Sequence, residues 1–127
     1  MLEQGIVAHL SADTTLLGMV GTRIYPTMMP QNANTFPAIV YTDVSASTDV
    51  NLDLSAVSFM RIQFDCRGNT YADSKNVAAK LHTLFDAYQG TLPDGTVVRY
   101  TECGVSMSQY DKDARIYRQI EDWTFQY

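Results

Sequence analysis

Positive charge is scarce in this sequence of 127 residues. It has nine Lys and Arg residues against fourteen Asp and Glu residues, which gives a formal net charge of −5. Proteins that hold nucleic acid by neutralising phosphates carry a basic patch or stripe, and this balance argues against that class. Charged residues of both signs make up only 18% of the chain, against about 25% in an average soluble domain. A surface of low charge favours packing against copies of the same chain or against protein partners.

Long apolar runs and cysteines are also few. No run approaches the roughly 18 apolar residues that a membrane-spanning helix needs, and the first residues lack the basic region of a signal peptide. We therefore expect no membrane partner and synthesis in the cytoplasm. The two cysteines, Cys66 and Cys103, are too few for a disulfide framework. We expect both to be reduced, buried thiols with structural roles.

The pattern of apolar residues predicts one α+β domain over residues 1–127. Helical spacing predicts a helix at 2–12, a short helical turn after Asp13, and a long helix at 70–89 that Thr70 and Asp73 open as a capping box. Alternating or β-branched segments predict four strands, at residues 38–48, 56–67, 96–107 and 115–127. The order α-ββ-α-ββ favours an antiparallel four-stranded sheet with helices packed on one face.

Motifs of catalysis and metal binding are missing. The sequence has no glycine-rich phosphate loop, no G-x-S-x-G and no H-E-x-x-H. Four residues could in principle form a zinc site, but no pair has the spacing of known ligand motifs, and we interpret them as structural: His9, His82, Cys66 and Cys103. We predict that the protein is not an enzyme and has no catalytic residue, metal or cofactor.

The charged residues between Arg23 and Arg61, a span that includes most of the first predicted hairpin, are all acidic. No Lys or Arg lies between Arg23 and Arg61, whereas this span contains three acids: Asp43, Asp49 and Asp53. Asp49 and Asp53 could be paired carboxylates for acid–base chemistry. No His, Lys or Arg lies beside them in the sequence, so a solvated hairpin tip is the favoured interpretation.

Basic residues gather instead near the second predicted hairpin, as Lys112, Arg115 and Arg118, mixed with acids. Blocks of opposite charge on different edges of one domain can pair between neighbouring copies in a ring. Met28 and Met29 lie in a proline-rich loop at 27–36. They either form an adaptable contact surface or fill a gap under that loop. These acids, bases and methionines are the candidate interface or lumen residues.

Two segments of the sequence resemble a known family. The first is Arg-Ile-Tyr-Pro at 23–26, followed by a proline-rich loop and Phe-Pro-Ala-Ile-Val-Tyr at 36–41. The second is Arg-Ile-Gln-Phe-Asp at 61–65, followed by Thr-Tyr-Ala-Asp at 70–73. Together they resemble the tail-completion or tail-terminator proteins of long-tailed bacteriophages. The likeness covers residues 2–127 in length and element order and is sharpest over 23–89.

The resemblance implies a structural virion protein that is made in the bacterial cytoplasm. Such proteins form a ring, usually a hexamer, that caps the tail tube at the end facing the head. The implied partners are further copies of the chain, the major tail tube protein and the head-completion or connector protein. DNA would pass through the lumen without specific binding.

Two other classes stay open on the residues alone. One is a small-ligand-binding or regulatory α+β module, with the open face of the sheet as its site. The other is an enzyme that uses Asp and His residues scattered in sequence. A monomer in light scattering would favour the ligand module over the ring.

Overall fold

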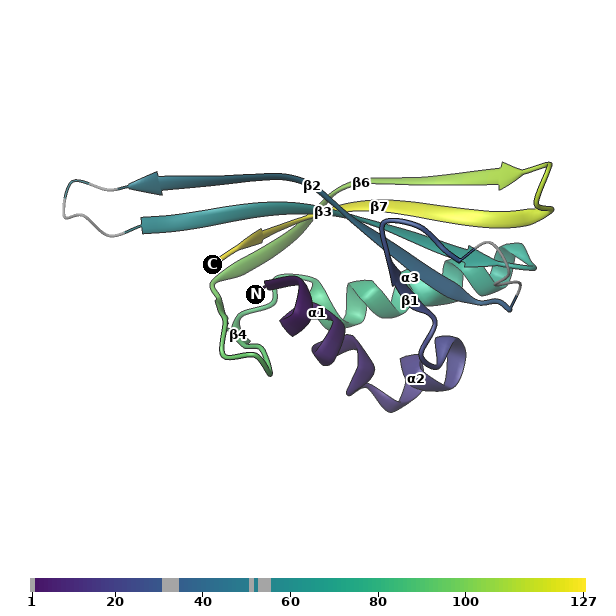
Figure 1. The fold of residues 1–127 in the computed structure, drawn as a ribbon, viewed down its shortest axis with the longest axis horizontal. Helices are drawn as coiled ribbons and strands as arrows, with labels where there is room; N and C mark the ends of the chain where they lie inside the picture. The colour runs from purple at the N-terminus through teal and green to yellow at the C-terminus, as the bar shows by residue number, and fades with distance from the viewer. Residues whose placement is uncertain (1, 31–34, 51, 53–55) are drawn as a thin grey trace.

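The computed structural model describes residues 2–30, 35–50, 52 and 56–127. Its main sheet has five strands in the order β1-β2-β3-β7-β6. Three helices lie together on one side of this sheet (Figure 1). In chain order the elements are α1 (Leu2–Ser11), α2 (Thr14–Val20), β1 (Ile24–Pro26), β2 (Ala38–Val50), β3 (Ala56–Gly68), α3 (Tyr71–Phe85), β4 (Gly90–Thr91), β5 (Val97–Val98), β6 (Tyr100–Asp111) and β7 (Ile116–Gln126).

The predicted α+β class is confirmed, but a purely antiparallel sheet of four strands is wrong. The long strands β2, β3, β7 and β6 pair antiparallel as expected. Ile24–Pro26 adds β1, which pairs in parallel with residues 39–41 of β2. Pro26 has no N–H to donate to a ladder, so it suits an edge strand such as β1. Two short strands, β4 and β5, form a separate sheet before β6 begins.

The long helix α3 begins where its capping residues predict. The Thr70 hydroxyl accepts a hydrogen bond from the backbone N–H of Asp73 at 3.1 Å, which satisfies one of the free donors of the first turn. The helix ends at Phe85 rather than near 89, because the C-cap Asp86 has an extended ψ of 119° and Ala87 takes a positive φ of 50°, and a right-handed helix allows neither. None of the helices among the described residues has the length and apolarity needed to cross a membrane.

The main core lies between α3 and the middle of the sheet. Val77, Leu81 and Phe85 of α3 are buried, as are Ile62, Phe64 and Cys66 of β3. The β3 residues alternate along the strand and so share one face of the sheet. The predicted burial of Cys66 is therefore confirmed.

Replacing Cys66 by Ala is expected to lower the free energy of unfolding by about 1–2 kcal/mol, since the change removes a fully buried group from the core. Urea denaturation measures the effect. Ser47→Ala, at an exposed position of β2, is the control and should change stability by less than about 0.5 kcal/mol. Equal effects of the two substitutions would contradict the packing role of Cys66.

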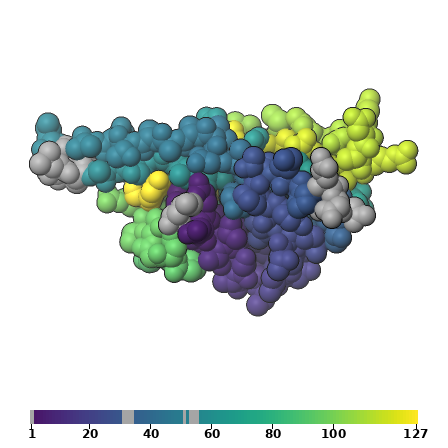
Figure 2. All heavy atoms as spheres, in the orientation of Figure 1, coloured from purple at the N-terminus to yellow at the C-terminus, as the bar shows by residue number. Residues whose placement is uncertain are grey.

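The two long hairpins project in opposite directions from the helical layer (Figure 1). The last residue of β7 that pairs with β3 is Gln126, opposite Phe59. Beyond that point residues 48–50 of β2 and 56–58 of β3 pair with each other. The one further backbone contact in this stretch of the described chain joins Ser58 of β3 to Tyr127. We call residues 48–50 and 56–58 the β2–β3 arm, and Figure 2 shows it standing clear of the body of the molecule.

Candidate functional site

One edge of the sheet is formed by β6, which pairs only with β7 among the described strands. Four large apolar side chains of this strand are exposed: Tyr100 (41%), Val105 (50%), Met107 (44%) and Tyr110 (50%). A long edge strand presents unpaired backbone donors and acceptors that can pair with another chain. Exposed apolar side chains beside such an edge favour contact with a protein partner.

The opposite edge is the outer side of β2. Its first part is covered by β1, which reaches only from Ile39 to Tyr41. From Thr42 to Val50 no strand of the described chain pairs with this side. Val44 and Val50 are exposed here, and a register shift between Asp43 and Ser45 bends the strand. Each molecule therefore has two different open edges, on opposite sides of one sheet.

The acidic candidates lie along this second edge. Asp43 and Asp49 are both exposed on β2, whereas Asp53 lies outside the described residues. Asp43 also borders a surface hollow of about 340 Å³, whose other lining residues are Glu3, Gln4, Pro26, Thr27 and Tyr41. Their role in a contact or in a lumen stays a prediction.

The basic candidates do not behave as one cluster. Lys112 and Arg115 are exposed in the turn between β6 and β7. Arg118 instead lies on β7 and donates hydrogen bonds to Asp65 of β3, the shortest being 2.6 Å from Nη2 to Oδ2. These bonds and the charge of Asp65 raise the pKa of Arg118. Arg118 is thus engaged within the chain, and Lys112 and Arg115 are the freer cations.

Replacing Arg118 by Ala is expected to lower the free energy of unfolding by about 1–3 kcal/mol, because Asp65 is buried and would lose one of its two cationic partners. Thermal denaturation measures the change. Lys112→Ala, which removes an exposed cation of the same hairpin, should alter stability by less than about 0.5 kcal/mol. A loss no larger for Arg118→Ala than for this control would show that the ion pair adds nothing.

Met28 and Met29 occupy different environments. Met29 is buried and packs with Ala38 and Val40 in a small second cluster, against Tyr25 and Phe36. Ala38 and Val40 alternate with Ile39 of the main core, so this cluster lies on the sheet face opposite the helices. Met29 therefore fills a gap under the proline-rich loop. Met28 is 69% exposed and is available for a contact.

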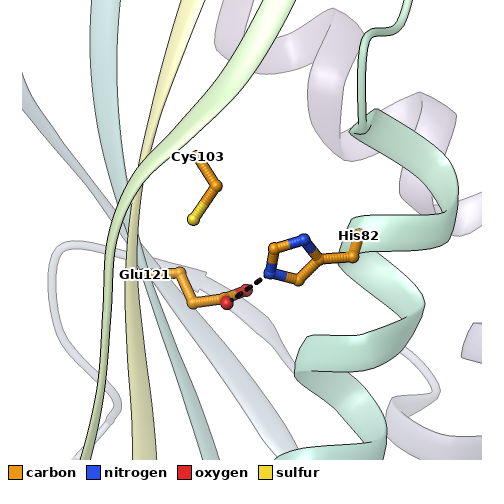
Figure 3. A group of neighbouring side chains, drawn as sticks. All are labelled: His82, Cys103 and Glu121. Carbon is orange, nitrogen blue, oxygen red and sulfur yellow. Dashed lines mark hydrogen bonds and ion pairs between the residues drawn. The ribbon is translucent and has the colours of Figure 1, made fainter.

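A polar cluster that the sequence did not predict lies between α3 and the sheet. His82 of α3, Cys103 of β6 and Glu121 of β7 each direct a side-chain ligand atom toward the others (Figure 3), and these atoms lie within 4.8 Å of one another. His82 Nε2 lies 2.6 Å from Glu121 Oε2. The hydroxyl of Ser106 donates to the same oxygen at 2.9 Å. The side chain of Glu121 is only 2% exposed.

The charges of this cluster shift its titrating groups. Burial lowers the pKa of His82, but its hydrogen bonds to Glu121 and Asp86 and their negative charges outweigh burial, so its pKa lies above the ordinary value. Burial, followed by the charges of Glu121, Asp86 and Asp122, raises the pKa of Cys103 to about 11. Cys103 is only half-buried, so the prediction of a buried thiol is wrong for this residue.

The four residues that could in principle have formed a zinc site do not all lie together in the structure. Cys66 is buried in the main core. The ring of His9 lies 4.9 Å from Tyr88 and 5.4 Å from Phe85, between ring centroids. Only His82 and Cys103 of the four belong to the polar cluster. The sequence contained a sign that Glu121 is buried. Glu121 precedes Trp123 and Phe125 by two and four positions in one strand, so it shares their buried face.

Open strand edges with exposed apolar side chains, on a small α+β domain, define a protein suited to assembly with other chains. A comparison with family models shows to which protein family the chain belongs. The model of the tail completion protein gp17 family matches residues 4–123, and the chain belongs to that family. It is accordingly a structural protein of the virion tail, as the sequence resemblance implied.

A solved structure has the same fold. It is a chain of the "Virion of native gene transfer agent (GTA) particle", with a TM-score of 0.73 at 15% sequence identity. The match covers 98% of this chain and 92% of that chain. The comparison with curated proteins found no match.

Proposed function

We propose that copies of this chain form a hexameric ring that caps the tail tube at its head-facing end and joins the tail to the head-completion proteins. The observation that carries the proposal is the pair of different open edges, the outer side of β2 and the outer side of β6. A contact between two different surfaces of identical subunits is heterologous, and it closes into a ring when the rotation fits. The edge of β6 in one copy would meet the edge of β2 in the next.

Apolar surface supports this contact. Val105 and Met107 would lose their exposure to water in it, and apolar burial is the main driving force of association. The exposed charges of the two hairpins suit other contacts: Asp49 lies near the end of the β2–β3 hairpin, whereas Lys112 and Arg115 lie in the turn of the β6–β7 hairpin. Because these hairpins extend in opposite directions, the acid and the two cations would face different axial partners rather than each other.

The two projecting hairpins suit the two axial partners. Because they extend in opposite directions from the helical layer, one can reach the major tail tube protein while the other reaches the head-completion protein. A net charge of −5 on each copy is repeated around the ring axis. Such a field repels phosphates rather than binding them, so DNA would pass through the lumen without being held. The proposal assigns the protein no catalytic role.

Reconstruction of tails by electron microscopy tests this proposal. The expected result is a closed ring of this chain at the head-facing end, with strand edges of adjacent copies in contact. Tails made without the chain should be overlong and unjoined to heads. A reconstruction that places the chain outside any ring would overturn the proposal. A monomer in free solution would not, because the end of the tube can template the ring.

A further inference from the structure

The polar cluster of His82, Cys103 and Glu121 combines three side chains that ligate metals. They come from three separate elements, α3, β6 and β7, and their ligand atoms all lie within 4.8 Å of one another (Figure 3). A tetrahedral zinc ion with metal–ligand distances near 2.0–2.3 Å separates its ligand atoms by roughly 3.3–3.8 Å. Shifts of about 1 Å in side-chain positions would bring the three atoms to that spacing.

A second observation points to a ligand. Glu121 Oε1 is buried and has no hydrogen-bond partner among the described residues. Its companion Oε2 already accepts from Ser106 and contacts His82. A buried carboxylate oxygen without a partner is costly, and a bound cation would satisfy it.

We propose that His82, Cys103 and Glu121 form a binding site for a zinc-like divalent cation, which none of the comparisons assigns to this chain. Mixed nitrogen, sulfur and oxygen donors suit Zn²⁺ rather than Mg²⁺ or Ca²⁺, which prefer oxygen ligands alone. The inference does not depend on the ring.

The surroundings of His82 fit metal binding. Its Nδ1 lies 3.1 Å from Asp86 Oδ1. Without metal, Nε2–H donates to Glu121. Metal binding would release this proton to solvent, while Nδ1–H donates to Asp86 and the lone pair of Nε2 faces the ion, as in the carboxylate–histidine–zinc arrangement. Neutral His82 with the anionic forms of Glu121 and Cys103 carries a charge of −2, which a divalent ion balances. The Cys103 thiol loses its proton to solvent when the metal–sulfur bond forms.

The position of the cluster determines how an ion reaches it and which elements a bound ion would connect. The side chain of His82 is 36% exposed and Asp86 is exposed, so an ion can reach the cluster past these two side chains. Three protein ligands leave a fourth position for water, as in open zinc sites. A bound ion would join α3 to the β6–β7 hairpin and so stiffen the element that carries the exposed β6 edge.

Protection of Cys103 from alkylation tests the site on the full wild-type chain. The protein is stripped with chelator and treated with iodoacetamide in the presence of ZnSO₄ or MgCl₂, and modification is followed by mass spectrometry. With free zinc at 100 times its Kd, about 99% of sites are filled, and alkylation of Cys103 should slow about 100-fold. MgCl₂ should have no effect. Cys66, fully buried, is an internal control that stays unmodified throughout.

Variants and cobalt substitution make the result specific. Co²⁺ should give a thiolate-to-cobalt charge-transfer band that Cys103→Ser abolishes and Cys66→Ala retains. Asp86→Asn should weaken zinc affinity about 10-fold to 100-fold, and His9→Gln should leave it unchanged. The proposal is overturned if zinc protects Cys103 no better than magnesium does. It is equally overturned if His9→Gln weakens zinc binding as much as Asp86→Asn.

Discussion

A variant carrying Val105→Lys and Met107→Lys is expected to fold normally and to leave tails without a completed head-facing end. The two side chains are 50% and 44% exposed, so the substitutions should change the free energy of unfolding by less than about 0.5 kcal/mol each. Lysines on an edge strand are a natural device that blocks pairing with another chain. In the proposed ring they would place buried, unpaired charges in every subunit contact, which is costly. The titre of infectious particles should fall by several orders of magnitude.

The measurement combines thermal denaturation of the purified variant with electron microscopy of the particles. Overlong tubes and unjoined heads are the expected products. Asn76→Lys with Ala79→Lys is the matched control, because it adds the same charge at exposed positions of α3, away from both edges. A normal titre for the β6 variant would show that this edge does not form the subunit contact, and the ring would then need another interface.

Local pattern predicted the long elements of this fold well. The alternation of Ile62, Phe64 and Cys66 identified both β3 and its buried face, and Thr70 marked the start of α3. The strand β1 was missed as part of the sheet, because three residues carry little periodicity and their pairing with β2 is set by contacts distant in sequence. Tertiary context, rather than local propensity, decides such short strands.

The side-chain pairs at the candidate sites depend on register. Arg118 meets Asp65 because β3 and β7 pair with Arg67 opposite Arg118 and Asp65 opposite Ile120, so that both charges share one face. Cys103 and Glu121 lie on neighbouring strands, but the irregularity between Cys103 and Val105 shifts their relation. His82 approaches them from a helix packed across the sheet. Spacing rules for metal motifs within one segment cannot find ligands that three separate elements bring together.

The acidic residues of the first hairpin give the last prediction. Replacing Asp43, Asp49 and Asp53 together by Lys is expected to leave heads and tails unjoined or tubes overlong. Asp49 is exposed on the β2–β3 arm and Asp43 on the open edge of β2, which is where a neighbouring ring or subunit would contact the molecule. Reversing three charges per copy, repeated around the ring, would turn attraction to cations of the partner into repulsion within a Debye length of about 8 Å.

Two other outcomes of this experiment have distinct meanings. Normal assembly with retarded or incomplete DNA ejection would place the acids at the lumen, where lysines would bind the passing phosphates. The triple replacement by Asn separates charge sign from shape, because it removes the carboxylates without adding cations. If Asn is tolerated and Lys is not, repulsion or phosphate binding by the new cations is the cause. If Asn fails as well, the carboxylates themselves make the contact.

A normal titre for the Lys variant would contradict both roles, and the absence of cations between Arg23 and Arg61 would then have no bearing on assembly. The contact is the expected outcome, because a two-stranded arm that pairs mainly within itself and extends beyond β7 can reach a partner that the body of the domain does not touch.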